Sequence, residues 1–189
     1  MYNFFRFLVH LFSFVINTTH LSATQIAIQI ATQSSTYGVD YAASRAIDGN
    51  VNTISHTADN VLQPHWLELD LGKEYAITNV TVVNRWKDCC DRINGVVVHL
   101  LNGATETAQS APLVYKEPCP GVTVADQTYE FEFNGVTATK VKLVKDAKNG
   151  SSLNIAEVYV YGQIRYIKGM FLSREIIHLI DPRCNAARA

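Results

Sequence analysis

The chain has 189 residues, of which 48% are hydrophobic, and its formal net charge is −1. This length is sufficient for one domain with a substantial core. The near-neutral charge provides no basic field of the kind that nucleic-acid-binding proteins present, so nucleic acid is excluded as the expected partner.

The first residues have the pattern of a secretory signal peptide. Arg6 precedes a run of ten apolar or weakly polar residues at 7–16, and Leu21-Ser22-Ala23 follows. Ten residues are too few to span a bilayer, so we expect a signal peptide at residues 1–23 and a secreted, extracellular protein; an uncleaved anchor is the alternative. The sequons at Asn79 and Asn149 agree with export, and Asn149 lies in a turn sequence.

Six segments alternate apolar and polar residues, which is typical of strands with one buried face. Turn sequences such as Leu71-Gly72-Lys73 and Phe133-Asn134-Gly135 separate several of them. Many short strands at this spacing predict an all-β antiparallel sandwich over residues 24–163. The expected strands are residues 66–71, 77–84, 96–101, 129–133, 140–144 and 155–161.

Beyond Gly162 the pattern changes. Apolar residues between 164 and 180 recur every three or four positions, which is compatible with a short amphipathic helix. The extension at residues 164–189 is either a frayed terminus or a helix that docks on a partner or a membrane surface.

Two adjacent cysteines, Cys89 and Cys90, lie between Arg85 and Arg92. Neighbouring Cα atoms are about 3.8 Å apart, below the usual span of a disulfide, so a bridge between them would be a strained ring. Strain of this kind is found mainly at functional sites, and an oxidising compartment would allow the bond. We expect an apolar sulfur face beside two fork-shaped guanidiniums, a pairing that suits a sugar.

From Ala31 to Gly162 the sequence resembles the F-type lectins (fucolectins), a fucose-binding branch of the discoidin-like, coagulation factor V/VIII type C superfamily. The resemblance implies a jelly roll. It is carried by Ala31-Thr32-Gln33-Ser34-Ser35, Ala46-Ile47-Asp48-Gly49-Asn50, Ser55-His56-Thr57, Trp66-Leu67-Glu68-Leu69-Asp70-Leu71-Gly72, the Cys-Cys segment and Ala156-Glu157-Val158-Tyr159-Val160-Tyr161-Gly162.

The resemblance implies a fucose site made by His56, Arg85 and Arg92. Asp88, between the two arginines, would fix their donors before the ligand arrives. Ordinary alternatives are a histidine bonded to main chain, and surface arginines paired with Asp88 and Asp91. Four further candidates are the sulfur pair Cys89 and Cys90, Tyr37 beside the sugar methyl group, and Trp86 against a neighbouring sugar.

Other aromatic and cysteine residues are expected to be structural. We assign Trp66 to the core, and His65 and His99 to strand edges. Cys119 resembles one member of a loop disulfide of the family whose partner is missing, which leaves it only Cys184.

The same resemblance implies a Ca²⁺ site. Its oxygen-only ligands suit a hard cation, although Asp48 before Gly49 is also a common Asx-turn residue. Glu157 favours a cation because a carboxylate beside an apolar strand is costly to bury without a partner. The implied ligands are the main chains of Arg45, Asn50 and Ala156 and the side chains of Asp48, Thr53 and Glu157.

These features predict a secreted, non-catalytic lectin for terminal L-fucose or related 6-deoxy sugars on glycans and glycoproteins. Hydrolysis is disfavoured because no pair of carboxylates and no nucleophile with its base is present in the expected pocket. The alternative is a discoidin-type adhesion module that binds anionic phospholipid, or a protein such as collagen. Single sugar sites are weak, so a homo-oligomer would supply avidity, and the oligomeric state stays open.

Overall fold

The structure is a computed structural model that describes residues 23–59, 62–115, 123–146 and 151–164. The expected signal peptide and the C-terminal extension lie outside these residues, apart from Ala23 and Ile164 at their edges. The Asn149 sequon, Cys119 and Cys184 also lie outside them. Among the described residues, no helix is long and apolar enough to cross a membrane.

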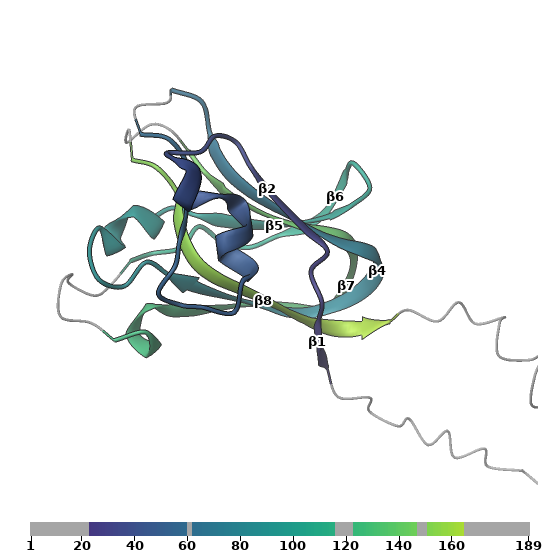
Figure 1. Cartoon of the computed structure of the whole chain (residues 1–189). Helices are drawn as coiled ribbons and strands as arrows, with labels where there is room; N and C mark the ends of the chain where they lie inside the picture. The colour runs from purple at the N-terminus through teal and green to yellow at the C-terminus, as the bar shows by residue number, and fades with distance from the viewer. Residues whose placement is uncertain (1–22, 60–61, 116–122, 147–150, 165–189) are drawn as a thin grey trace, which may run out of the picture.

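Antiparallel strands form a β-sandwich (Figure 1), which confirms the predicted fold class. The strands are β1 (Thr24–Ile26), β2 (Ile30–Gln33), β3 (Ser55–His56), β4 (His65–Asn84), β5 (Val97–Asn102), β6 (Thr105–Gln109), β7 (Thr128–Lys145) and β8 (Asn154–Ile164). Short 3-10 turns connect some of them: η1 (Val39–Tyr41), η2 (Ala43–Ile47), η3 (Cys90–Ile93) and η4 (Ala125–Gln127).

Two long strands, β4 and β7, run through both layers of the sandwich. The first half of β4 pairs with β2 and the second half with β8, while β7 pairs with β4 along most of its length. The register shifts between Asp70 and Tyr75, where Gly72 adopts a φ of +76°. Four of the expected short strands are therefore halves of two bent strands, because the sequences predicted as turns bend the chain without ending the pairing.

The core lies between the layers and takes every second side chain of the strands. Leu67, Leu69 and Leu71 of β4 are buried, with 1% or less of their surface exposed. Trp66 lies on the opposite, outer face, where Lys142 Nζ is 4.4 Å from its ring centroid. The assignment of Trp66 to the core is wrong because Trp66 shares its face with Glu68 and Asp70.

One end of the sandwich gathers the predicted binding residues. The short strand β3 pairs with the start of β8, opposite Asn154. The turn η3 follows the end of β4 and contacts β8. The pairing of β3 with β8 and the course of the chain after β4 therefore bring His56 and Arg92 together, although 35 residues lie between them.

Candidate functional site

His56 and Arg92 make direct contact at this end. Nδ1 of His56 lies 2.6 Å from the carbonyl oxygen of Thr57, and Nε2 lies 3.2 Å from Nη1 of Arg92. A carbonyl only accepts, so Nδ1 carries the proton and donates it, which leaves Nε2 as the acceptor of the guanidinium N–H. The backbone thus selects the tautomer that holds the arginine.

Nη1 of Arg92 has further acceptors close by. Ser152 Oγ lies at 2.9 Å, Asn154 Oδ1 at 3.3 Å and Asp59 Oδ1 at 3.4 Å. One edge of the guanidinium is therefore occupied by protein, while Nε and Nη2 have no hydrogen-bond partner among the described residues. The side chain retains 24% of its exposure, so an oriented set of donors faces outward.

Burial lowers the pKa of His56 from its usual value. The hydrogen bond to Thr57 and the charge of Asp59 act to raise it, and the positive charges of Arg92 and Arg85 act to lower it. The net result favours the neutral imidazole, which is the form that accepts from Arg92. His56 is 4% exposed, so it mainly orients the guanidinium.

Arg85 is held in the same way by a different partner. Its Nε donates to Oδ1 of Asp88, and this pair leaves Nη1 and Nη2 without protein acceptors among the described residues. The hydrogen bond from Arg85 keeps the pKa of the Asp88 carboxyl below its usual value. Asp88 therefore fixes one arginine rather than bridging two, because the hydrogen bonds of Arg92 go to other residues.

Two tyrosines enclose the histidine. The Tyr37 ring centroid is 4.7 Å from that of His56, and Tyr41 meets the same ring edge-on at 5.5 Å. Tyr37 is 57% exposed and provides an apolar surface at the rim. Sequence reasoning found Tyr37 and missed Tyr41, although the two lie four residues apart around η1, a spacing that could have suggested a pair.

A small pocket of about 200 Å³ opens between the loop after η2 and the segment after β4. Trp86 lines it, and its Nε1 donates to the carbonyl of Val51 at 3.1 Å. Lys87 Nζ lies 5.0 Å from the Trp86 ring centroid. Trp86 is thus half-buried beside Arg85 and ties the two loops together, while part of its ring borders the pocket.

The expected sulfur face is not formed. Cys89 has a free thiol, so no bridge joins it to Cys90. Cys89 adopts a left-handed backbone with φ of +49° before η3, and Cys90 turns inward with 0% exposed. The prediction of a vicinal disulfide is wrong, because Cys90 is a core residue and offers no surface to a ligand.

Four of the predicted cation ligands, Asp48, Asn50, Thr53 and Glu157, lie close together in the structure. Thr53 Oγ1 lies 2.8 Å from Oδ2 of Asp48, and the backbone N–H of Asn50 donates to both Asp48 and Glu157 at 2.9 Å. Arg45 Nη1 lies 3.4 Å from Asp48, and Ala156 precedes Glu157 in β8. Sequence positions separated by about a hundred residues therefore meet in one cluster.

Glu157 is a buried carboxyl in close contact with a second acidic side chain, Asp48. It is 1% exposed, and burial together with the neighbouring Asp48 carboxyl raises its pKa to about 7. Burial also acts to raise the pKa of Asp48, but hydrogen bonds from Thr53 and Asn50 outweigh it and lower that pKa. Two carboxylates in contact and a loop of oxygen atoms fit a hard cation, although no group of three His, Cys, Asp or Glu side chains forms among the described residues.

The architecture and the loop-end site define a discoidin-like, galactose-binding type of domain. A family model described as an F5/F8 type C, NedA-like, galactose-binding domain matches residues 45–143. The chain belongs to this family. A search of curated protein sequences finds no match.

Solved structures share the fold along nearly their whole length. The lectin domain of lectinolysin in complex with Lewis b antigen is 30% identical, with a TM-score of 0.62 over 75% of this chain and 98% of that one. A fucose-binding module of Streptococcus pneumoniae is 25% identical, with a TM-score of 0.62 over 75% and 96%. The family 32 module of NanJ from C. perfringens, in complex with galactose, is 25% identical, with a TM-score of 0.58 over 74% and 99%.

Proposed function

We propose that the protein is a secreted lectin that binds terminal L-fucose or a related 6-deoxy sugar without chemical change. The observation that carries this proposal is the pair of guanidiniums, Arg85 and Arg92, each held along one edge and open along the other. Open N–H donors match the acceptor oxygens of sugar hydroxyls. Similar lectin and fucose-binding modules support a carbohydrate as the ligand.

The aromatic rim supports a deoxy sugar in particular. Tyr37 presents an exposed ring against His56, the partner of Arg92, and Trp86 lines the pocket together with Arg85. A methyl group gains free energy when an apolar surface covers it, whereas a hydroxyl at the same position would lose hydration there. The two rings therefore favour a sugar with a methyl group over its hydroxylated counterpart.

We further propose that Ca²⁺ binds at Asp48, Asn50, Thr53 and Glu157. The ion would supply positive charge to two carboxylates and tie the loop after η2 to β8. Because Trp86 bonds to Val51 in this loop, an ordered loop also fixes one wall of the pocket. Calcium would act through loop order and would not touch the sugar.

No chemistry is proposed for the site. The pairing of Asp88 with Arg85 keeps that carboxyl ionised, and Glu157 is enclosed in the cation cluster. A glycosidase needs an acid and a second carboxylate on either side of the bond that breaks. The side chains around Arg85 and Arg92 supply binding and orientation instead.

A glycan array with free fucose as competitor, run with calcium and with EDTA, tests the proposal. We expect binding to fucose-terminated glycans, loss with excess fucose, and weaker binding in EDTA. Binding that free fucose does not displace would contradict the sugar assignment, and equal binding in EDTA would contradict only the role of calcium.

One observation favours the phospholipid alternative. Val39 and Leu62 lie in connecting segments on either side of β3 and expose 94% and 87% of their surface. Exposed apolar loop tips beside basic residues are a feature of membrane-surface binding. Phosphatidylserine vesicles therefore belong in the same experiment: attachment that survives both excess fucose and Arg92→Ala would favour the lipid.

A further inference from the structure

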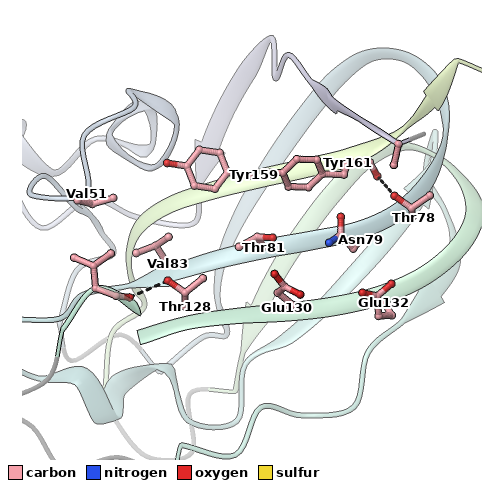
Figure 2. Close-up of a pocket in the computed structure, with 12 residues that line it drawn as sticks. Val51, Thr78, Asn79, Thr81, Val83, Thr128, Glu130, Glu132, Tyr159 and Tyr161 are labelled. Carbon is pink, nitrogen blue, oxygen red and sulfur yellow. Dashed lines mark hydrogen bonds between the residues drawn. The ribbon is translucent and has the colours of Figure 1, made fainter. Parts of the chain in front are cut away.

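A second hollow lies away from the arginines. It is a groove of about 600 Å³ on the outer face of the layer formed by β8, β4 and β7 (Figure 2). Val80, Val82 and Val160 of these strands are buried in the core, so the alternating side chains point outward into the groove. It shares only Val51, at one end, with the pocket beside Arg85.

The side chains of the groove form two equivalent rows across the strands. Tyr161, Asn79 and Glu132 occupy one set of paired positions. Tyr159, Thr81 and Glu130 occupy the next set, two residues further along each strand, at a spacing of about 7 Å. Each row thus presents a phenol, a neutral polar group and a carboxylate in the same order, as Figure 2 shows.

Among the described residues, no hydrogen bond or ion pair involves the side chains of these rows. The lining residues include Glu130 and Glu132 but neither lysine nor arginine. The groove therefore combines two aromatic rings with two uncompensated carboxylates, which complement a ligand with at least two positive charges.

A peptide strand does not fit this surface. β4 lies in the middle of the groove and already pairs with β7 on one side and β8 on the other, so β4 offers no backbone edge for strand addition there. Recognition must come from side chains. Ammonium groups on a short repeating chain can meet one carboxylate per row while the carbon frame lies against the tyrosine rings.

We propose that this groove is a second ligand site, and that it takes a chain of ammonium-bearing units. Two sources carry that chemistry: an oligosaccharide of amino sugars with free amines, and an aliphatic polyamine. The amino sugar adds apolar C–H faces that stack on Tyr159 and Tyr161, whereas the polyamine relies on the ion pairs with Glu130 and Glu132.

Calorimetric titrations test the site, with the protein produced without N-glycosylation because Asn79 heads a sequon in the groove. The probes are a glucosamine trisaccharide, its N-acetylated counterpart and spermidine, in mildly acidic buffer where free amines are charged. We expect the free-amine trisaccharide to bind and the acetylated one to bind at least about tenfold more weakly. Equal binding of the two sugars, or no binding of either amine, would overturn the proposal.

Two variants with the same charge change provide the control. Glu130→Gln should weaken amine binding about fivefold, since one partly shielded ion pair is lost. Glu106→Gln, on β6 outside the groove, should leave it unchanged; an equal effect of both would show attraction to net charge alone and refute the site. If the natural ligand is an amino sugar, Tyr159→Ala should reduce the affinity for the trisaccharide more than the affinity for spermidine. If the natural ligand is a polyamine, the variant should reduce both affinities equally.

Free fucose separates this proposal from the first one. Because the groove and the pocket beside Arg85 have only Val51 in common among their lining residues, excess fucose should leave amine binding unchanged. Displacement of the amine by fucose would place the amine at Arg85 and Arg92 and overturn the second site. Failure of fucose to bind anywhere would contradict the proposed lectin function and leave the groove experiment intact.

Discussion

Nη1 of Arg92 donates to Nε2 of His56 at 3.2 Å, while Nδ1 of the same ring donates to the carbonyl of Thr57. The histidine is therefore a neutral link between backbone and guanidinium. Protonation of Nε2 would replace an acceptor with a donor that faces another donor. This relationship couples the orientation of Arg92 to pH.

Replacement of Arg92 by alanine should reduce fucose affinity by roughly tenfold to a hundredfold, because hydrogen bonds from a charged donor contribute about 1.5–3 kcal/mol. Arg92→Lys should also fail, since a single ammonium cannot both meet the acceptors of Nη1 and present outward donors. Titration calorimetry measures both, with Lys73→Ala as a control on a distant surface. Affinity of either Arg92 variant close to that of the wild type would contradict the site.

Acidification should weaken fucose binding, with a midpoint below the usual histidine value of about 6.5, because burial lowers the pKa of His56. The free energy of unfolding should also decrease on acidification. As pH falls below about 6.5, His56 becomes protonated in the unfolded state before it does so in the folded state. The free energy of unfolding therefore decreases. A pH series of calorimetric titrations with an NMR titration of His56 gives both midpoints; a midpoint above 6.5 would contradict the neutral link.

The buried Lys145 should position Arg92. Lys145 is 4% exposed, its Nζ donates to the carbonyl of Arg92, and burial lowers its pKa to about 8. Lys145→Met should cost about 1–3 kcal/mol of unfolding free energy, because the carbonyl loses a charged donor. It should also weaken fucose binding, since η3 is released. Lys140→Met, on the outer face of the same strand, is the matched control and should leave sugar affinity unchanged.

Some of the site could be read from sequence and some could not. His56, Arg85 and Arg92 were found because family resemblance preserves their order in the chain. Ser152 and Asn154 were missed because their contact with Arg92 depends on the pairing of β3 with β8. No local pattern encodes that pairing.

The errors have equally specific causes. Trp66 is two residues from Glu68 and four from Asp70, so the two-residue period of a strand already places its side chain on the polar face. Two adjacent cysteines predict a bridge between them only if both sulfur atoms lie on the same side of the backbone. A 3-10 turn places consecutive side chains in different directions, so one cysteine points to the core and the other does not.

A non-reducing peptide map should find Cys89 as a free thiol and Cys90 linked to Cys119 or Cys184. Cys89 is free in the structure and Cys90 is not, so the partner of Cys90 is another cysteine of the chain. Alkylation without reduction should label Cys89. Cys89→Ser should keep sugar affinity, whereas Cys90→Ala should destabilise a fully buried position. A peptide in which Cys89 and Cys90 are joined to each other would contradict this prediction and support the vicinal disulfide.

Calcium should stabilise the protein through Glu157. A ligand that binds only the folded state at a hundredfold excess over its Kd adds about 2.7 kcal/mol, so calcium should raise the Tm and EDTA lower it. Glu157→Gln removes one ligand charge, and it also removes the repulsion between Glu157 and Asp48. The variant should therefore lose the calcium response while its stability in EDTA stays equal to the wild type or rises.

Glu68→Gln, which disturbs only surface pairs with Lys140 and Lys142, is the control and should keep the full response to calcium. If neither calcium nor EDTA changes the Tm of the wild type, the calcium site is contradicted. Asp48 would then be only the acceptor of an ordinary Asx turn.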